Sequence, residues 1–276
     1  GYMIMGGVPF YWSQLKPGMS LAQNINQLFF SEDGNLRHEF EDLYDSLFKQ
    51  PKPYLSIVDA LATKKVGMTR TEILQATKLT DNGKLTEYLE NLEYCGFIRK
   101  YNCIGMKAKN ALFQLMDNYT LFYYKFIKDS YINDAQYWTK ITGKPEYNTW
   151  CGLAFERVCL QHVEQIKTKL GIQGVITTVY SWSVAGSKEK SGAQIDLLID
   201  RSDDVINLCE IKYSKAPFQI TNTIDASLQN KRERFIQETG TEKAVHLTMI
   251  TTMGLSDNPY AWDIQSAVTM DDLFVL

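Results

Sequence analysis

The sequence predicts a multi-domain chain in which helical modules are followed by an α/β domain. Apolar residues recur at helical spacing through most of the first half, whereas residues 150–276 alternate helical stretches with β-rich runs. A length of 276 residues is enough for two domains or three small modules. Two segments rich in Pro, Gly and Lys, at 49–53 and 142–146, are typical of boundaries between modules.

Residues 1–50 are predicted to form a small helical unit. Leu21, Ile25 and Leu28 recur at helical spacing, and Ser20 before them is a candidate N-cap. A second apolar series with the same spacing follows. The Lys-Gln-Pro-Lys-Pro segment is expected to end this unit.

Residues 51–117 are predicted to form three helices and a β-hairpin. The second helix begins with a capping-box pattern, Thr69 followed by Glu72, and Gly96 is expected to end the third. Two short β-rich runs follow, Phe-Ile-Arg-Lys-Tyr and Ala-Leu-Phe-Gln-Leu-Met-Asp. This order resembles a winged helix-turn-helix.

A winged helix-turn-helix implies that its third helix enters the major groove of DNA. Here that helix is acidic, so phosphates repel it, and a packing or protein-contact role is favoured over sequence-specific reading. Its charged residues are Asp81, Lys84, Glu87, Glu90 and Glu93. The wing is more basic, with Arg99, Lys100, Lys107 and Lys109. We therefore expect weak duplex DNA binding without sequence preference.

Residues 118–149 form a predicted helical connector rich in aromatic side chains. An aromatic stripe at helical spacing ordinarily belongs to a core, and we expect these rings to pack between modules. Stacking on bases is the alternative.

Residues 150–276 are predicted to contain a helix near 150–170, three strands, a helix near 222–239 and a further strand. The two strands within 192–214 carry charged residues where buried strands ordinarily carry apolar ones. Glu210 and Lys212 lie two residues apart and so share a strand face, and Asp196 on the preceding strand can lie across from them.

These three residues can form a metal site or a salt bridge. Two carboxylates that converge in a partly dry cleft repel each other and need a cation. Hard oxygen ligands without His or thiolate select Mg²⁺ or Mn²⁺ rather than zinc. Lys212 beside such an ion could orient or deprotonate a water molecule for attack on a phosphate. The alternative is a structural salt bridge of Lys212 with Glu210 or Asp196.

The Ile-Asp and Glu-Ile-Lys motifs, together with the order of elements, resemble the PD-(D/E)XK nuclease superfamily. The αβββαβ restriction-endonuclease-like core of that superfamily corresponds to residues 150–252. The resemblance implies that Asp196 is the first acid and that Glu210 and Lys212 form the (D/E)xK pair. Asp196 and Glu210 would then be metal ligands. Members that do not cut also belong to this superfamily.

The same resemblance extends to the two helices of the domain. It implies that Glu156, in the leading helix, is a further metal ligand, whereas an exposed helix face is the alternative. Gln229 and Lys231 fall on the later helix, which often contributes polar groups to the active site. For both of them a solvent-exposed position is favoured.

The front of the chain resembles a second family. Met-Gly-Gly-Val-Pro-Phe-Tyr-Trp and the helices after it look like the lid of a group of prokaryotic AAA+-type ATPases. In those proteins a winged helix and a PD-(D/E)XK-like module follow the lid. The sequence contains no GxxxxGK[ST] loop, so this chain is not expected to hydrolyse ATP alone. The resemblance implies ATP binding only in a longer protein with an N-terminal ATPase domain.

Composition limits the partners and the location. A net charge of −3 and a pI near 5.7 exclude a general attraction to nucleic acid, so DNA binding must be local. Five cysteines without CxxC spacing fit a reducing compartment, and no apolar run reaches the length of a membrane span. We expect a cytoplasmic location and no membrane partner.

The sequence thus predicts the C-terminal region of a prokaryotic ATPase with a Mg²⁺-dependent nuclease or nucleic-acid-associated role. The alternative is a catalytically inactive nuclease fold that acts as a protein-interaction or regulatory module.

Overall fold

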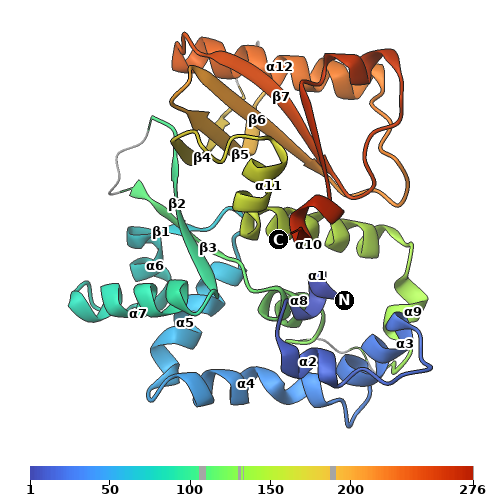
Figure 1. Cartoon of the computed structure of the whole chain (residues 1–276). Coiled ribbons are helices and arrows are strands. Elements are labelled where there is room, and N and C mark those ends of the chain that lie inside the picture. The colour runs from blue at the N-terminus through green and yellow to red at the C-terminus, as the bar shows by residue number, and fades with distance from the viewer. Residues whose placement is uncertain (106–109, 130–131, 133, 187–190, 276) are drawn as a thin grey trace. The chain divides into compact units, whose positions relative to one another are not determined.

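The computed structural model describes residues 1–105, 110–129, 132, 134–186 and 191–275. Within those residues, no helix is both long and apolar enough to cross a membrane. The chain divides into two compact units (Figure 1). Unit 1 consists of residues 1–100 and 112–154, and unit 2 of residues 101–111 and 155–276. Both units combine helices with strands, so the chain is a mixed α/β protein.

Unit 1 begins with a series of helices. They are α1 (Tyr2–Met5), α2 (Pro9–Ser13), α3 (Leu21–Ile25), the π-helix Asn26–Phe30 and α4 (Asn35–Leu47). The predicted N-cap Ser20 is confirmed. Its hydroxyl accepts a hydrogen bond from the Gln23 N–H, and the Gln23 side chain accepts one from the Ser20 N–H.

Three helices and two strands follow in the predicted order. They are α5 (Pro51–Ala62), α6 (Arg70–Thr77), α7 (Gly83–Tyr94), β2 (Ile98–Cys103) and β3 (Leu112–Leu115), with β1 (Met68–Thr69) antiparallel to β3. Pro51, in the segment predicted to end the first unit, is the first residue of α5. An N–H at this position has no partner within the helix, so proline loses no hydrogen bond there. The capping box of Thr69 and Glu72 is confirmed. Lys107 and Lys109 of the predicted wing lie outside the described residues.

The aromatic segment belongs to the core of unit 1. It contains α8 (Asn118–Phe126) and α9 (Tyr137–Ile141). Phe122, Phe126 and Trp138 are at most 5% exposed. The Trp138 ring meets Phe122 and Phe126 edge to face, with centroids 5.2 and 5.4 Å apart. Rings buried in this way cannot stack on bases, so core packing is confirmed for these three.

Unit 2 has the predicted order of a helix, three strands, a helix and a strand. Its elements are α10 (Pro145–Gln161, which begins in unit 1), α11 (Val163–Lys169), β4 (Thr177–Val184), β5 (Ala193–Arg201), β6 (Val205–Lys212), α12 (Asn222–Thr239), β7 (Ala244–Thr251) and β8 (Ser266–Thr269). The single helix expected over 150–170 is wrong. The chain leaves helical geometry at His162 (φ −117°, ψ 35°), and α10 and α11 are therefore separate.

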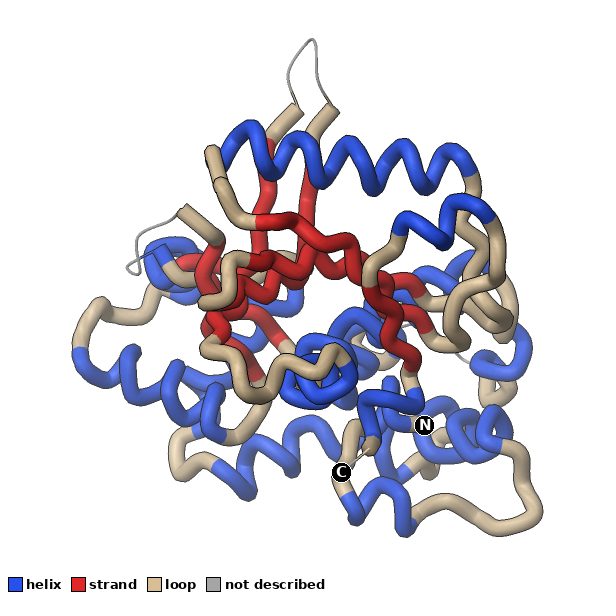
Figure 2. Tube along the Cα trace, turned by 45° about the horizontal axis from the view of Figure 1, so that its top comes forward, coloured by secondary structure: helices blue, strands red, loops and turns tan. Residues whose placement is uncertain are grey.

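A mixed sheet forms the centre of unit 2. Its strands are hydrogen-bonded in the order β2-β4-β5-β6-β7-β8, with the last residues of β2 parallel to β4. The ladder from β4 to β6 is antiparallel and that from β6 to β8 is parallel. Figure 2 shows α12 lying along one face of these strands. Its Leu228 and Phe235 pack in one core cluster with Leu198, Leu208 and Leu247 of the sheet.

Candidate functional site

The predicted acids Asp196 and Glu210 lie where the pairing between β5 and β6 ends. The antiparallel register of these strands runs from Asp200↔Ile206 to Leu197↔Cys209. Asp196 and Glu210 are the next residue of each strand, just beyond the last register pair. We call this place the fork.

A β-bulge lies on the Asp196 side of the fork. Tyr180 pairs with Leu198 and Trp182 pairs with Ile195, so two residues of β5, Asp196 and Leu197, oppose one residue of β4. Such a bulge bends its strand and changes the direction of a side chain. On the other side of the fork, β6 stays paired with β7 through Lys212.

Glu210 is held by two ammonium groups. Its side chain is 11% exposed, and its Oε1 and Oε2 lie 2.8 Å from Lys212 Nζ and 2.7 Å from Lys231 Nζ. Burial by itself would raise the pKa of Glu210, but the charges of Lys231 and Lys212 outweigh it, so the pKa lies below its ordinary value. The predicted alternative of a salt bridge between Lys212 and Glu210 is therefore confirmed.

The solvent-exposed position favoured for Lys231 is wrong. Its side chain is 20% exposed and its ammonium donates to Glu210. The sequence contains the signal for this placement, because Lys231 follows the buried Leu228 by three residues and precedes the buried Phe235 by four. Residues at that spacing share one helix face.

Gln229 is also only partly exposed. Its Nε2 donates to Asp225 Oδ1 over 3.1 Å. Its Oε1 is buried and has no hydrogen-bond partner within the described residues. The prediction of a solvated helix face is therefore wrong for this residue as well.

Asp196 has a different partner from Glu210. Its Oδ1 accepts a 2.6 Å hydrogen bond from Gln194 Nε2. Gln194 is exposed and alternates with Ala193 and Ile195, which belong to the core cluster under α12. Asp196 therefore lies beside the exposed Gln194 at this end of β5, whereas Glu210 contacts Lys231 of α12. That Asp196 and Glu210 share one ion stays a prediction.

Glu156 of α10 is buried and paired. It is 7% exposed, and its Oε1 lies 2.7 Å from a terminal guanidinium nitrogen of the adjacent Arg157, which is 1% exposed. The alternative of an exposed helix face is therefore wrong. Its role as a metal ligand stays a prediction, and Arg157 was not predicted as its partner.

The donor chemistry of the fork fits Mg²⁺ or Mn²⁺, because Asp196 and Glu210 offer hard carboxylate oxygens. The arrangement does not yet match a metal centre. In the part of the chain that the structure describes, no group of three or more His, Cys, Asp or Glu side chains is placed to hold a metal ion. Both oxygens of Glu210 contact ammonium groups, which an ion would have to displace.

Comparisons with known proteins add little. No protein-family model matches the chain, and no curated protein matches it significantly. Among solved structures, the chain is similar to protein VC1899 from Vibrio cholerae, at 10% identity and a TM-score of 0.27. The match covers 92% of this chain and 54% of that protein, so the chain spans about half of its length.

Proposed function

We propose that the chain is the C-terminal region of a prokaryotic AAA+-type ATPase and that the fork binds and cleaves phosphodiesters with Mg²⁺ or Mn²⁺. The observation that carries the proposal is the charge of the cluster at the fork. Two ammonium groups, Lys212 and Lys231, meet the single carboxylate of Glu210. With Asp196 the fork holds two carboxylates and two ammonium groups, so a bound divalent ion would give it the net positive charge that attracts a phosphate anion.

Each residue has a role in this proposal. Lys212, whose side chain is 42% exposed, contacts the phosphate or the attacking water. Glu210 orients Lys212 and can release Lys231 when a cation approaches. Asp196 supplies a second carboxylate once it turns from Gln194. The ion itself would stabilise the negative charge that develops on the phosphate.

The test is a cleavage assay on the 276-residue chain. Labelled single-stranded and duplex DNA and RNA are incubated with Mg²⁺ or Mn²⁺ and either wild type, Lys212→Ala or Glu210→Gln. We expect cleavage by wild type and a loss of at least about a hundredfold in both variants, the size typical of lost charge stabilisation. Lys140→Ala, an exposed ion pair in unit 1, is the matched control and should cleave like wild type. Equal cleavage by all four proteins would indicate a contaminating nuclease and contradict the proposal.

A second candidate is a catalytically inactive nuclease fold that contacts a protein. The engagement of both Glu210 oxygens by lysines favours it, because that cluster is complete without a metal. The acidic α7 favours a protein contact over DNA, since Glu87, Glu90 and Glu93 are exposed on it. Absence of cleavage by wild type with either ion would leave this candidate.

A further inference from the structure

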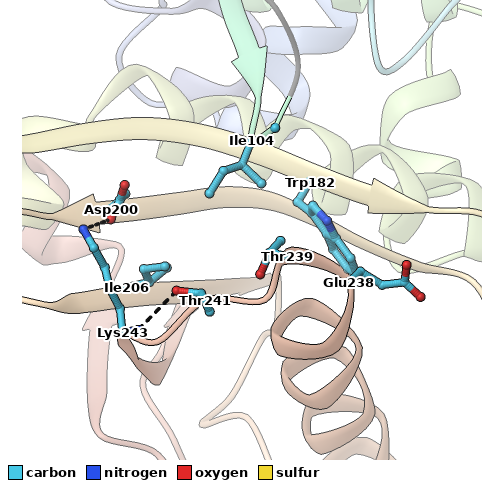
Figure 3. Close-up of a pocket in the computed structure, with 9 residues that line it drawn as sticks. Ile104, Trp182, Asp200, Ile206, Glu238, Thr239, Thr241 and Lys243 are labelled. Atoms are coloured by element: carbon cyan, nitrogen blue, oxygen red, sulfur yellow. Dashed lines mark hydrogen bonds and ion pairs between the residues drawn. The ribbon is translucent and has the colours of Figure 1, made fainter.

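Unit 2 contains a pocket that is separate from the fork. A cavity of about 420 Å³ lies where α12 ends, next to the end of β5 and the start of β6 (Figure 3). Its volume falls in the range of small-molecule sites, about 300–1,000 Å³. None of the fork residues Asp196, Glu210, Lys212 and Lys231 lines it.

The pocket has an apolar surface formed by a fixed aromatic ring and two aliphatic side chains. Trp182 is 6% exposed, and its ring packs edge to face on Phe235, with centroids 5.4 Å apart. Ile104 and Ile206 also line the cavity. Figure 3 shows these two side chains between Asp200 on one side and Trp182 on the other. Because the indole is held by its neighbours, a flat ring is the ligand shape that such a surface favours.

The polar groups at the edge of the pocket are mainly acceptors. Lys243 Nζ donates to Asp200 Oδ1 and to the carbonyl oxygen of Arg201, each over 2.7 Å. The Thr239 hydroxyl donates to the carbonyl oxygen of Phe235. These donors are therefore used within the protein, and the Thr241 hydroxyl, which also lines the pocket, accepts from the Lys243 backbone N–H. The second carboxylate oxygen of Asp200 has no partner among the described residues, and an ionised carboxylate only accepts. A ligand group that approaches this oxygen must therefore be a hydrogen-bond donor.

Each charged side chain that lines the pocket has a partner of opposite charge. Asp200 pairs with Lys243, and Glu238 pairs with Arg234, whose guanidinium lies 3.1 Å away. The ion pair raises the pKa of Lys243, so the ammonium stays charged at neutral pH. The pocket lining therefore offers no unpaired charge to a phosphate or an alkylammonium ion. A neutral ligand fits this balance.

We propose that this pocket binds a neutral, planar heterocycle with an exocyclic amino group, of the aminopurine or aminopyrimidine nucleoside class. The amino group donates to the second oxygen of Asp200. The ring lies on Ile104 and Ile206 and extends toward Trp182. A carbonyl at the position of the amino group would place two acceptors together, which costs affinity because neither is satisfied.

The first test compares matched nucleosides by calorimetric titration of the 276-residue chain. Adenosine and cytidine carry the amino group, whereas inosine and uridine carry a carbonyl in its place. We expect at least one amino nucleoside to bind about tenfold more tightly than its carbonyl counterpart, because the carbonyl loses the hydrogen bond to Asp200. The proposal is overturned if neither amino nucleoside binds at about 1 mM, or if each pair binds equally.

Variants then locate the binding. Asp200→Asn should weaken the amino nucleoside about tenfold. Because Asp200 also pairs with Lys243, a second variant, Thr239→Trp, fills the mouth from an exposed position and should abolish binding. Lys212→Ala, at the fork, should leave the affinity unchanged. Unchanged affinity in both pocket variants would contradict the assignment, whatever the outcome of the cleavage assay.

Discussion

Glu210 is the residue on which the fork depends most. Its carboxylate is nearly buried, so removing one of its two ammonium partners leaves a charge poorly compensated. We predict that Lys231→Met lowers the free energy of unfolding by about 2–3 kcal/mol, measured by urea denaturation followed by circular dichroism.

The matched control is an exposed ion pair. Lys140 and Asp134 lie 2.7 Å apart, with side chains 61% and 37% exposed. Lys140→Met should change the free energy of unfolding by only about 0–1 kcal/mol. Similar losses in the two variants would mean that burial of Glu210 does not strengthen its dependence on Lys231.

The lowered pKa of Glu210 predicts how stability depends on pH. A carboxylate whose pKa is lower in the folded state stabilises the protein above its unfolded pKa, near 4.5, and this contribution is lost as the pH falls through the folded value. Glu210→Gln removes this titration. We expect the stability advantage of wild type over Glu210→Gln to be constant above about pH 5.5 and to shrink below pH 4.5. An advantage that grows toward acid pH would contradict the sign of the shift.

At the residue scale, the sequence was enough to find the charged positions but not their partners. Asp196, Glu210 and Lys212 stood out because charge is rare inside apolar strands. Their geometry depends on a bulge in β5 and on the side of α12 that faces the sheet. The spacing of residues within one strand reveals neither. Period two places Glu210 and Lys212 correctly on one face, whereas the bulge breaks the alternation that would have aligned Asp196 with them.

At the element scale, the helix caps make the sharpest prediction. The Thr69 hydroxyl accepts from the Glu72 N–H at the start of α6, and Glu72 Oε2 accepts from the Thr69 N–H over 2.7 Å. Thr69→Ala should lower the free energy of unfolding by about 1 kcal/mol. Thr63→Ala removes a hydroxyl that bonds only to the Ala60 carbonyl oxygen, and it should stay within about 0.5 kcal/mol in the same urea titration. Equal effects would show that the capping box contributes nothing specific.

Capping patterns in the sequence correctly predicted where two helices begin. Ser20 and Thr69 carry capping patterns, and both caps were found where expected. The break at His162 and the strand β8 were missed for the same reason. Neither is marked by Pro or Gly, and β8 has only four residues, held by its parallel register with β7.

At the scale of the whole molecule, the sequence did not predict which residues far apart in the chain pack together. The aromatic segment predicted as a connector lies in unit 1, where Phe122 meets Phe29 of the N-terminal helices, with centroids 4.8 Å apart. More than ninety residues separate these two rings along the chain, and periodicity within a helix does not report which distant ring completes a core.

The central claim is that Asp196 and Glu210 bind a divalent ion together, and unfolding with and without metal tests it most directly. The ion binds the folded chain only, so it should stabilise wild type by about 2.7 kcal/mol when its free concentration is a hundred times its dissociation constant. Urea denaturation is compared with and without Mg²⁺ or Mn²⁺ for wild type and Asp196→Asn. We predict that wild type gains this stability and Asp196→Asn does not. An equal metal response in both proteins would contradict a shared ion and leave Glu210, Lys212 and Lys231 as a structural ion cluster.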